Sequence, residues 1–139
     1  DQYGNAAEPV NVPFTLDTAR PLPPSLALRS EDDTGSSAHD GFTKLTTLRI
    51  DASAEPAARV RVYLDGVPVG EQLAGGPMEF SVTSIADGQH TFTAQAEDAA
   101  GNRSVFTAPL LVRAMAALRS TFWRRLRSRS GKRRATVWA

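Results

Sequence analysis

The sequence predicts an all-β fold, a two-sheet sandwich of about seven strands. Short segments alternate between apolar and polar residues and are rich in β-branched and aromatic side chains. Turn-forming residues bound these segments at intervals of roughly ten residues, a spacing typical of sandwiches. Before residue 113 no helical periodicity separates the segments, whereas an open α/β sheet would need helices between its strands.

The clearest strand covers residues 59–64, where Val60, Val62 and Leu64 share one face. Asp65-Gly66 follows directly, and both residue types tolerate the positive φ of a tight turn. Residues 67–73 then return as a second strand. This stretch therefore predicts a β-hairpin.

The other strands are predicted from the same alternation, with turn signals such as Asp87-Gly88 between them. They cover residues 25–29, 45–53, 78–84, 90–96 and 105–112. Their expected inward-facing residues are Leu48, Ile50, Ala52, Met78, Phe80, Val82, Phe92, Ala94 and Ala96. Residues 31–41 are polar and rich in turn formers, so we expect a loop there.

The net charge of +1 conceals two regions of opposite charge. Residues 1–112 hold 15 acidic and seven basic residues, whereas residues 113–139 hold nine basic residues and no acidic ones. Within the tail, Met115, Leu118, Phe122 and Leu126 have near-helical spacing. The basic tail is expected to be helical or disordered; it could bind anions or a membrane surface, or it could be the product of a shifted reading frame.

A short motif recurs about one sandwich domain apart. Residues 1–5 (DQYGN) and residues 98–102 (DAAGN) share the pattern D-x-x-G-N at an offset of 97. After a one-residue gap, residues 12–14 also match residues 108–110 loosely. Matching motifs at this spacing favour a tandem array of modules.

The repeat suggests three parts. Residues 1–20 would be the last strand and linker of a preceding module, residues 21–112 a complete module, and residues 113–139 the basic tail. Pro21-Leu22-Pro23-Pro24 marks the first boundary, because proline fixes φ and removes a backbone donor.

Residues 16–112 resemble the bacterial Ig-like repeats of large adhesins and biofilm-associated surface proteins. The resemblance lies in the order and spacing of LDTARP (16–21), DTG (33–35), DGFT (40–43), VRVYLDG (60–66), ADGQHTFT (86–93) and AEDAAGN (96–102). It implies an immunoglobulin-like, Greek-key β-sandwich. One departure is that Arg113 stands near the position of the linker aspartate Asp17.

The resemblance also implies a function. Such modules are stacked end to end as a non-catalytic stalk or spacer, sometimes beside adhesive modules, and lie outside the cell or on its surface. The partners would be neighbouring Ig-like modules and ligands of a host or biofilm surface. In the family, calcium often stiffens the junctions between successive modules.

Several acidic and amide side chains fall in the predicted loops, where calcium would find oxygen ligands. The candidate ligands are Asp17, Asp33, Asp40, Asp98 and Asn102, with Asp32 beside them. Alternate loops of a sandwich gather at one end, so some of these could converge with Asp17. The other interpretation is that Asp and Asn are simply turn formers, and their spacing matches no EF-hand loop.

No motif predicts catalysis. The sequence has no cysteine, no G-x-S-x-G elbow and no glycine-rich phosphate loop. Two alternatives to the spacer function remain open. One is a carbohydrate- or protein-binding sandwich that uses exposed aromatics such as Tyr3 and Tyr63; the other is anion or membrane binding through the tail. Nucleic acid is not an expected partner of the module itself.

Overall fold

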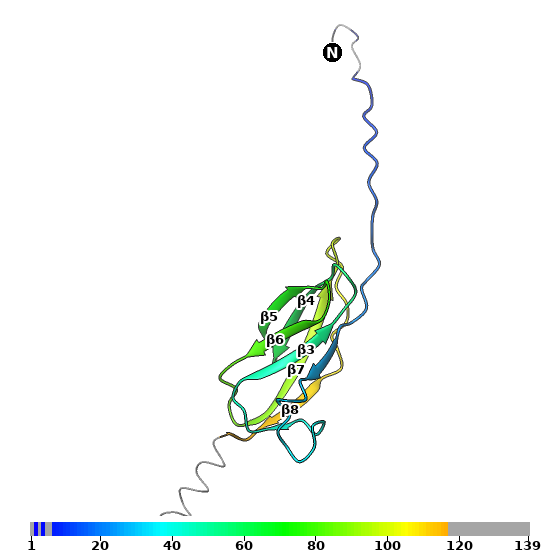
Figure 1. Cartoon of the computed structure of the whole chain (residues 1–139). Coiled ribbons are helices and arrows are strands. Elements are labelled where there is room, and N and C mark those ends of the chain that lie inside the picture. The colour runs from blue at the N-terminus through cyan, green and yellow to red at the C-terminus, as the bar shows by residue number, and fades with distance from the viewer. Residues whose placement is uncertain (1, 3, 5–6, 117–139) are drawn as a thin grey trace, which may run out of the picture.

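The computed structural model describes residues 2, 4 and 7–116, and the module is all-β (Figure 1). Its strands in chain order are β1 (Ser25–Leu28), β2 (Phe42–Thr43), β3 (Leu48–Ser53), β4 (Arg59–Leu64), β5 (Val67–Leu73), β6 (Met78–Val82), β7 (Gly88–Glu97) and β8 (Leu110–Ala114). The part of the predicted tail helix beyond residue 116 lies outside the described residues.

The strands form two sheets. One has the order β1-β3-β6 and the other β2-β8-β7-β4-β5. All pairs are antiparallel except β2 with β8, which run parallel. Because β3 and β6 pair in one sheet while β4 and β5 pair in the other, the chain crosses between the sheets as in an immunoglobulin-like Greek key. The predicted sandwich is confirmed.

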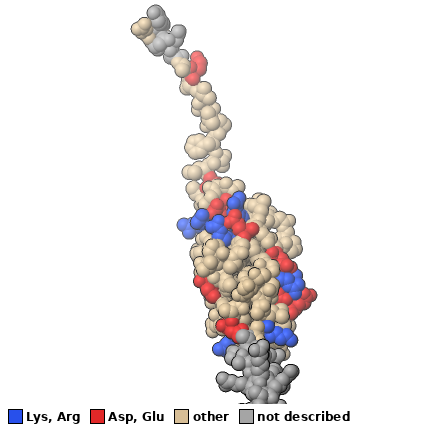
Figure 2. All heavy atoms as spheres, turned by 90° about the vertical axis from the view of Figure 1, so that its left-hand side faces the viewer, with Lys and Arg blue, Asp and Glu red and all other residues tan. Residues whose placement is uncertain are grey.

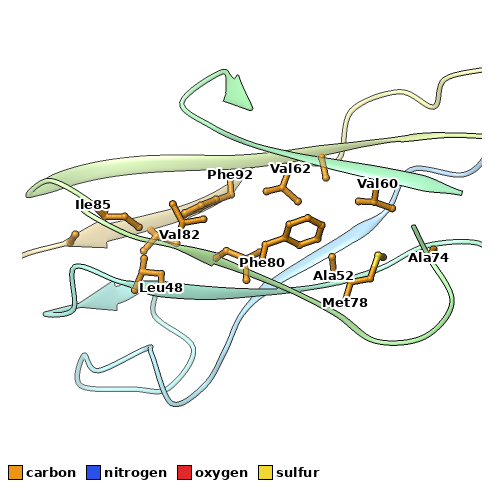
Figure 3. Packing of buried hydrophobic residues seen from close by; sticks show 14 residues of the cluster. Leu48, Ala52, Val60, Val62, Ala74, Met78, Phe80, Val82, Ile85 and Phe92 are labelled. Carbon is orange, nitrogen blue, oxygen red and sulfur yellow. The ribbon is translucent and has the colours of Figure 1, made fainter. Parts of the chain in front are cut away.

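The inner faces of the two sheets enclose one hydrophobic core (Figure 3). Its largest fully buried side chains are Phe92, Leu48, Ile50, Val60, Val62 and Val112. Every residue expected to face inward on β3, β6 and β7 is buried. The alternation identified the inner face correctly because successive side chains of a strand point to opposite faces of its sheet.

The predicted hairpin is also present. Asp65 and Gly66 have φ values of 50° and 84°, so both central residues of the turn are left-handed. That conformation matches the twist of the flanking strands β4 and β5. The hairpin register carries a bulge between Val62 and Tyr63.

The last strand differs from the prediction. Residues 105–109 form no strand, and β8 begins at Leu110 and continues to Ala114. The side-chain oxygens of Ser104 and Thr107 accept hydrogen bonds from the amides of Ala96 and Ala94, at 2.9 and 3.0 Å. These bonds replace part of the β7 ladder, and Pro109 has no amide to donate, so pairing with β8 starts only after it.

One strand, β2, was not predicted from the sequence. The two residues of β2 pair with Arg113 and Ala114 of β8, which raises the count from about seven to eight. A strand of two residues shows no alternation, so its hydrophobic pattern could not reveal it.

The chain enters and leaves the sandwich at opposite ends (Figure 1). At the entry end, the side-chain amide of Asn102 donates to the backbone carbonyl of Asp17 at 2.9 Å. At the exit end, the amides of Arg113 and Met115 donate to the carbonyls of Gly41 and Thr43 at 2.7 and 2.8 Å. Figure 1 shows the 98–102 turn at the top of the module and the 29–41 loop at the bottom.

Acidic and basic side chains lie next to one another on the face seen in Figure 2. On the outer surfaces of the sheets, Arg29 pairs with Asp51 and Glu79, and Arg61 pairs with Glu71. Opposite charges therefore neutralise one another locally on the module. Within the described part of the chain, no helix has the length and hydrophobicity required to cross a bilayer.

Candidate functional site

The five candidate calcium ligands divide between the two ends of the sandwich. Asp17, Asp98 and Asn102 meet at the entry end, and Asp33 and Asp40 lie in the 29–41 loop at the exit end (Figure 1). In the described residues no three His, Cys, Asp or Glu side chains gather in a group that could hold a metal. Within one module the structure therefore does not bring the five residues together.

At the entry end, the Asp98 carboxylate organises a tight turn. Its Oδ1 accepts from the amides of Ala100 and Asn102 at 2.9 and 2.8 Å, and its Oδ2 accepts from the Asn102 side chain at 3.0 Å. The hydrogen bond from the Asn102 side chain, together with those from backbone amides, lowers the pKa of Asp98. Gly101 completes the turn at a φ of +87°. Asp98 thus acts as the turn former that its residue type suggests.

Asn102 connects this turn to the incoming chain. Its Nδ2 donates to Asp98 and also to the carbonyl of Asp17, 85 residues earlier in the chain. The Asp17 carboxylate accepts from the amide of Ala19 at 2.9 Å. The linker before β1 is therefore fixed to the module by a specific contact.

At the exit end, Asp33 has an unsatisfied carboxylate oxygen. The residue is 8% exposed, and its Oδ2 accepts from the amide of Gly41 at 3.0 Å. Its Oδ1 is buried and receives no hydrogen bond from any described residue. A buried polar atom without a partner costs free energy, so a missing partner such as a cation would be favourable here.

Asp40 lies beside Asp33 in the same loop. It accepts from the amides of Phe42 and Ser37 at 3.1 and 3.0 Å and from the Ser36 hydroxyl at 3.3 Å. The hydrogen bond from the Phe42 amide is the main cause that lowers the pKa of Asp40, and the Asp33 carboxyl contributes. Asp33 and Asp40 thus form a pair of neighbouring carboxyl groups linked by a side-chain hydrogen bond, and Oδ1 of Asp33 accepts none from the described residues.

Asp32, next to Asp33 in sequence, has a different role. It is 3% exposed, and its carboxylate accepts from the backbone amide, Nε and Nη2 of Arg49 at 2.7, 3.1 and 2.6 Å. The hydrogen bonds from the Arg49 side chain lower the pKa of Asp32. Asp32 fixes the loop to β3. Spacing alone could not separate it from Asp33, because only the fold shows which carboxylate meets an arginine.

A histidine–aspartate pair that was not predicted from the sequence lies at the turn of the β4–β5 hairpin. Nδ1 of His90 lies 2.7 Å from Oδ2 of Asp65, and its Nε2 lies 2.8 Å from the carbonyl of Ala86. Both ring nitrogens face acceptors, which favours the doubly protonated imidazolium, and the hydrogen bond to Asp65 raises the pKa of His90. The pair joins the hairpin turn to β7. In these two contacts His90 meets a carboxylate and a backbone carbonyl, neither of which it could activate as a nucleophile.

Tyr63, one of the aromatics predicted to be available for a ligand, is half-buried. Tyr63 and Phe106 pack edge to face, with ring centroids 5.4 Å apart and an interplanar angle of 70°. This contact holds the ring of Tyr63 against Phe106, which is 52% exposed. Tyr3 and the tail tryptophans lie outside the described residues.

Comparison with known proteins agrees with the fold. Residues 20–112 match the sequence profile of a family described as bacterial Ig-like domain. No curated protein sequence matches the chain. Among solved structures, the crystal structure of an FMN-binding β-glucuronidase from Facaelibacterium prausnitzii L2-6 is similar, with 16% sequence identity and a TM-score of 0.47. That match covers 67% of this chain and 12% of the other, so the chain spans only a small part of that protein's length.

Proposed function

The chain belongs to the bacterial Ig-like domain family, and from this premise we propose that it serves as a non-catalytic stalk or spacer module of an exported, adhesin-like surface protein. The observation that carries the proposal is the placement of entry and exit at opposite ends of the sandwich (Figure 1). A module with this geometry lengthens any chain into which it is inserted. Neighbouring modules of the same kind are its expected partners.

Two features support a stiff spacer. The linker contains three prolines within four residues, and two of them, Pro21 and Pro24, are buried against the module. The Asn102 amide fixes the linker further through Asp17. Because few backbone torsions remain free between Asp17 and β1, the linker favours a constant angle between successive modules.

The spacer function predicts linear growth in length. We would fuse one, two and three copies of residues 17–112 in line, with the last copy extended to Met115 so that β8 is complete, and measure their maximum dimension by small-angle X-ray scattering. Each copy should add roughly 35 Å, because β7 has ten residues and a strand rises about 3.4 Å per residue. If the maximum dimension instead grows as it does for a compact particle, the modules fold back on one another and the proposal fails.

We also propose that calcium binds at the junction between two such modules. In an end-to-end array, the exit end of one module faces the entry end of the next. Asp33 and Asp40 of the first module would then approach Asp17, Asp98 and Asn102 of the second. The free Oδ1 of Asp33 supports a cation at this end, and the oxygen donor set suits calcium.

The calcium proposal predicts stabilisation of fusions that contain a junction, such as the two-copy fusion, and no stabilisation of the single copy. Calcium should raise the melting temperature of the two-copy fusion by several degrees, since a ligand at one hundred times its Kd stabilises the folded state by about 2.7 kcal/mol. Magnesium should not reproduce the effect, because it favours a rigid octahedral shell. The measurement is thermal unfolding followed by circular dichroism, with calcium, with magnesium and after chelation.

A matched pair of variants locates the ion. Asp33→Asn with Asp40→Asn in the first copy should abolish the calcium response, because that exit end faces the junction. The same substitutions in the second copy should leave the response intact, because its exit end faces solvent. An equal loss in both variants, or a calcium response in the single-copy protein, would rule out a junction site.

A further inference from the structure

The segment before the module carries an exposed apolar stripe. Val10, Val12, Phe14 and Leu16 are 84%, 74%, 84% and 75% exposed and occupy alternate positions. In Figures 1 and 2 the segment extends away from the sandwich. An alternating apolar stripe of this kind is the pattern of a strand with one buried face, yet here it faces solvent.

The segment corresponds to the region around β8. Gly4 of the first D-x-x-G-N motif has a φ of +75°, close to the +87° of Gly101 in the second motif, so both glycines are left-handed. With Pro13 aligned on Pro109, Phe14 matches Leu110 and Leu16 matches Val112. In β8 these two positions point into the core, and Val112 is 1% exposed.

The positions of the segment that match the outward-facing residues of β8 also correspond. Thr15 matches Leu111, which is 53% exposed, and Asp17 matches Arg113, which is exposed. At these four positions the segment therefore has apolar residues where β8 faces the core and polar residues where β8 faces solvent, and at a fifth position Thr18 matches the buried Ala114. A one-residue shift would exchange these faces and bury Asp17.

The position of β8 shows what such a strand requires. β8 lies between β7, with which it pairs antiparallel, and β2, with which it pairs parallel. Phe92 is opposite Leu110, and His90 is opposite Val112. A strand in this position pairs with β7 along its whole length and with β2 at its last two residues, and it buries every second side chain.

We infer that residues 14–18 form the β8-type closing strand of another module of this fold, with Phe14 and Leu16 in its core. The partner is a bacterial Ig-like sandwich that precedes residue 20 in an array. This inference rests on the proposed spacer function and adds to it that Phe14 and Leu16 of the exposed stripe belong to the core of the neighbouring module. Successive modules are then joined by only the short proline-rich linker.

A strand graft in the full chain tests the inference. Residues 12–16 (VPFTL) replace residues 108–112 (APLLV), which requires Ala108→Val, Leu110→Phe, Leu111→Thr and Val112→Leu and keeps Pro109. The grafted protein should retain a cooperative unfolding transition, with a midpoint within about 10 °C of the wild-type value. Thermal unfolding followed by circular dichroism measures it.

The control carries the same five residues with the last two exchanged (VPFLT), so that threonine occupies buried position 112. Its midpoint should lie at least about 5 °C below that of the graft, because a hydroxyl then enters the core. If the graft is no more stable than this control, the segment does not fit the position of β8 and the inference is wrong. That result would leave the length measurements on the fused modules, and hence the spacer function, untouched.

Discussion

Asp32→Ala should destabilise the module by about 3 kcal/mol, because it removes the buried partner of Arg49. The carboxylate accepts three hydrogen bonds from Arg49, one of them from the backbone amide at the start of β3. After truncation the Arg49 amide loses its acceptor at a position where Asp32 is only 3% exposed, and the half-buried guanidinium keeps only Glu31. Chemical denaturation at pH 7 measures the loss as a change in the free energy of unfolding.

Glu31→Ala is the matched control. Glu31 pairs with the same Arg49 at 3.1 Å, but its side chain is 71% exposed. An exposed ion pair contributes roughly 0–1 kcal/mol, so this variant should unfold almost like the wild type. Equal losses for the two variants would show that the buried contacts of Asp32 carry no special stability.

The effect of Asp32 should also depend on pH. Because Arg49 lowers the pKa of Asp32 in the folded state, ionised Asp32 stabilises the fold above its unfolded pKa of about 4. That contribution is lost as the pH falls through the lowered folded pKa. The difference in the free energy of unfolding between the wild type and Asp32→Ala should therefore be constant from pH 7 to about pH 5. Below about pH 4 this difference should become smaller.

The sequence predicted those parts of the fold that depend on local pattern. The inner faces of β3, β6 and β7 and the Asp65-Gly66 turn follow from alternation and turn chemistry, which neighbouring residues determine. The start of β8 depends instead on the hydrogen bonds that Ser104 and Thr107 accept from β7. The existence of β2 depends on its pairing with Arg113. Local pattern contains no information about such partners.

The candidate site shows the same division. The sequence identified Asp17, Asp33, Asp40, Asp98 and Asn102 as loop residues, and their loops are now placed at two ends of the module. It could not tell that Asp98 is saturated by its own turn, that Asp32 is neutralised by Arg49 or that Asp33 keeps a free oxygen. Those differences arise from contacts between residues up to 17 positions apart.

Gly41→Ala should destabilise the module by roughly 3 kcal/mol, because two separate costs meet at this residue. Gly41 has a φ of +71°, a conformation that residues with a Cβ adopt only under strain. A Cβ here would also lie 2.8 Å from the carbonyl oxygen of Leu111, which is backbone and cannot rotate away. Since the Gly41 carbonyl accepts from the amide of Arg113, the displacement would disturb the pairing of β2 with β8.

Gly66→Ala separates the two costs. Gly66 has a similar φ of +84°, but nothing lies within 4 Å of the position of its Cβ. This variant should therefore show the conformational strain alone, about 1 kcal/mol. Chemical denaturation should thus place Gly41→Ala well below Gly66→Ala in stability, the difference measuring the contact with Leu111. If both variants lost the same stability, β8 would be able to move away from the added Cβ. The exit end would then not hold a following module in a fixed orientation.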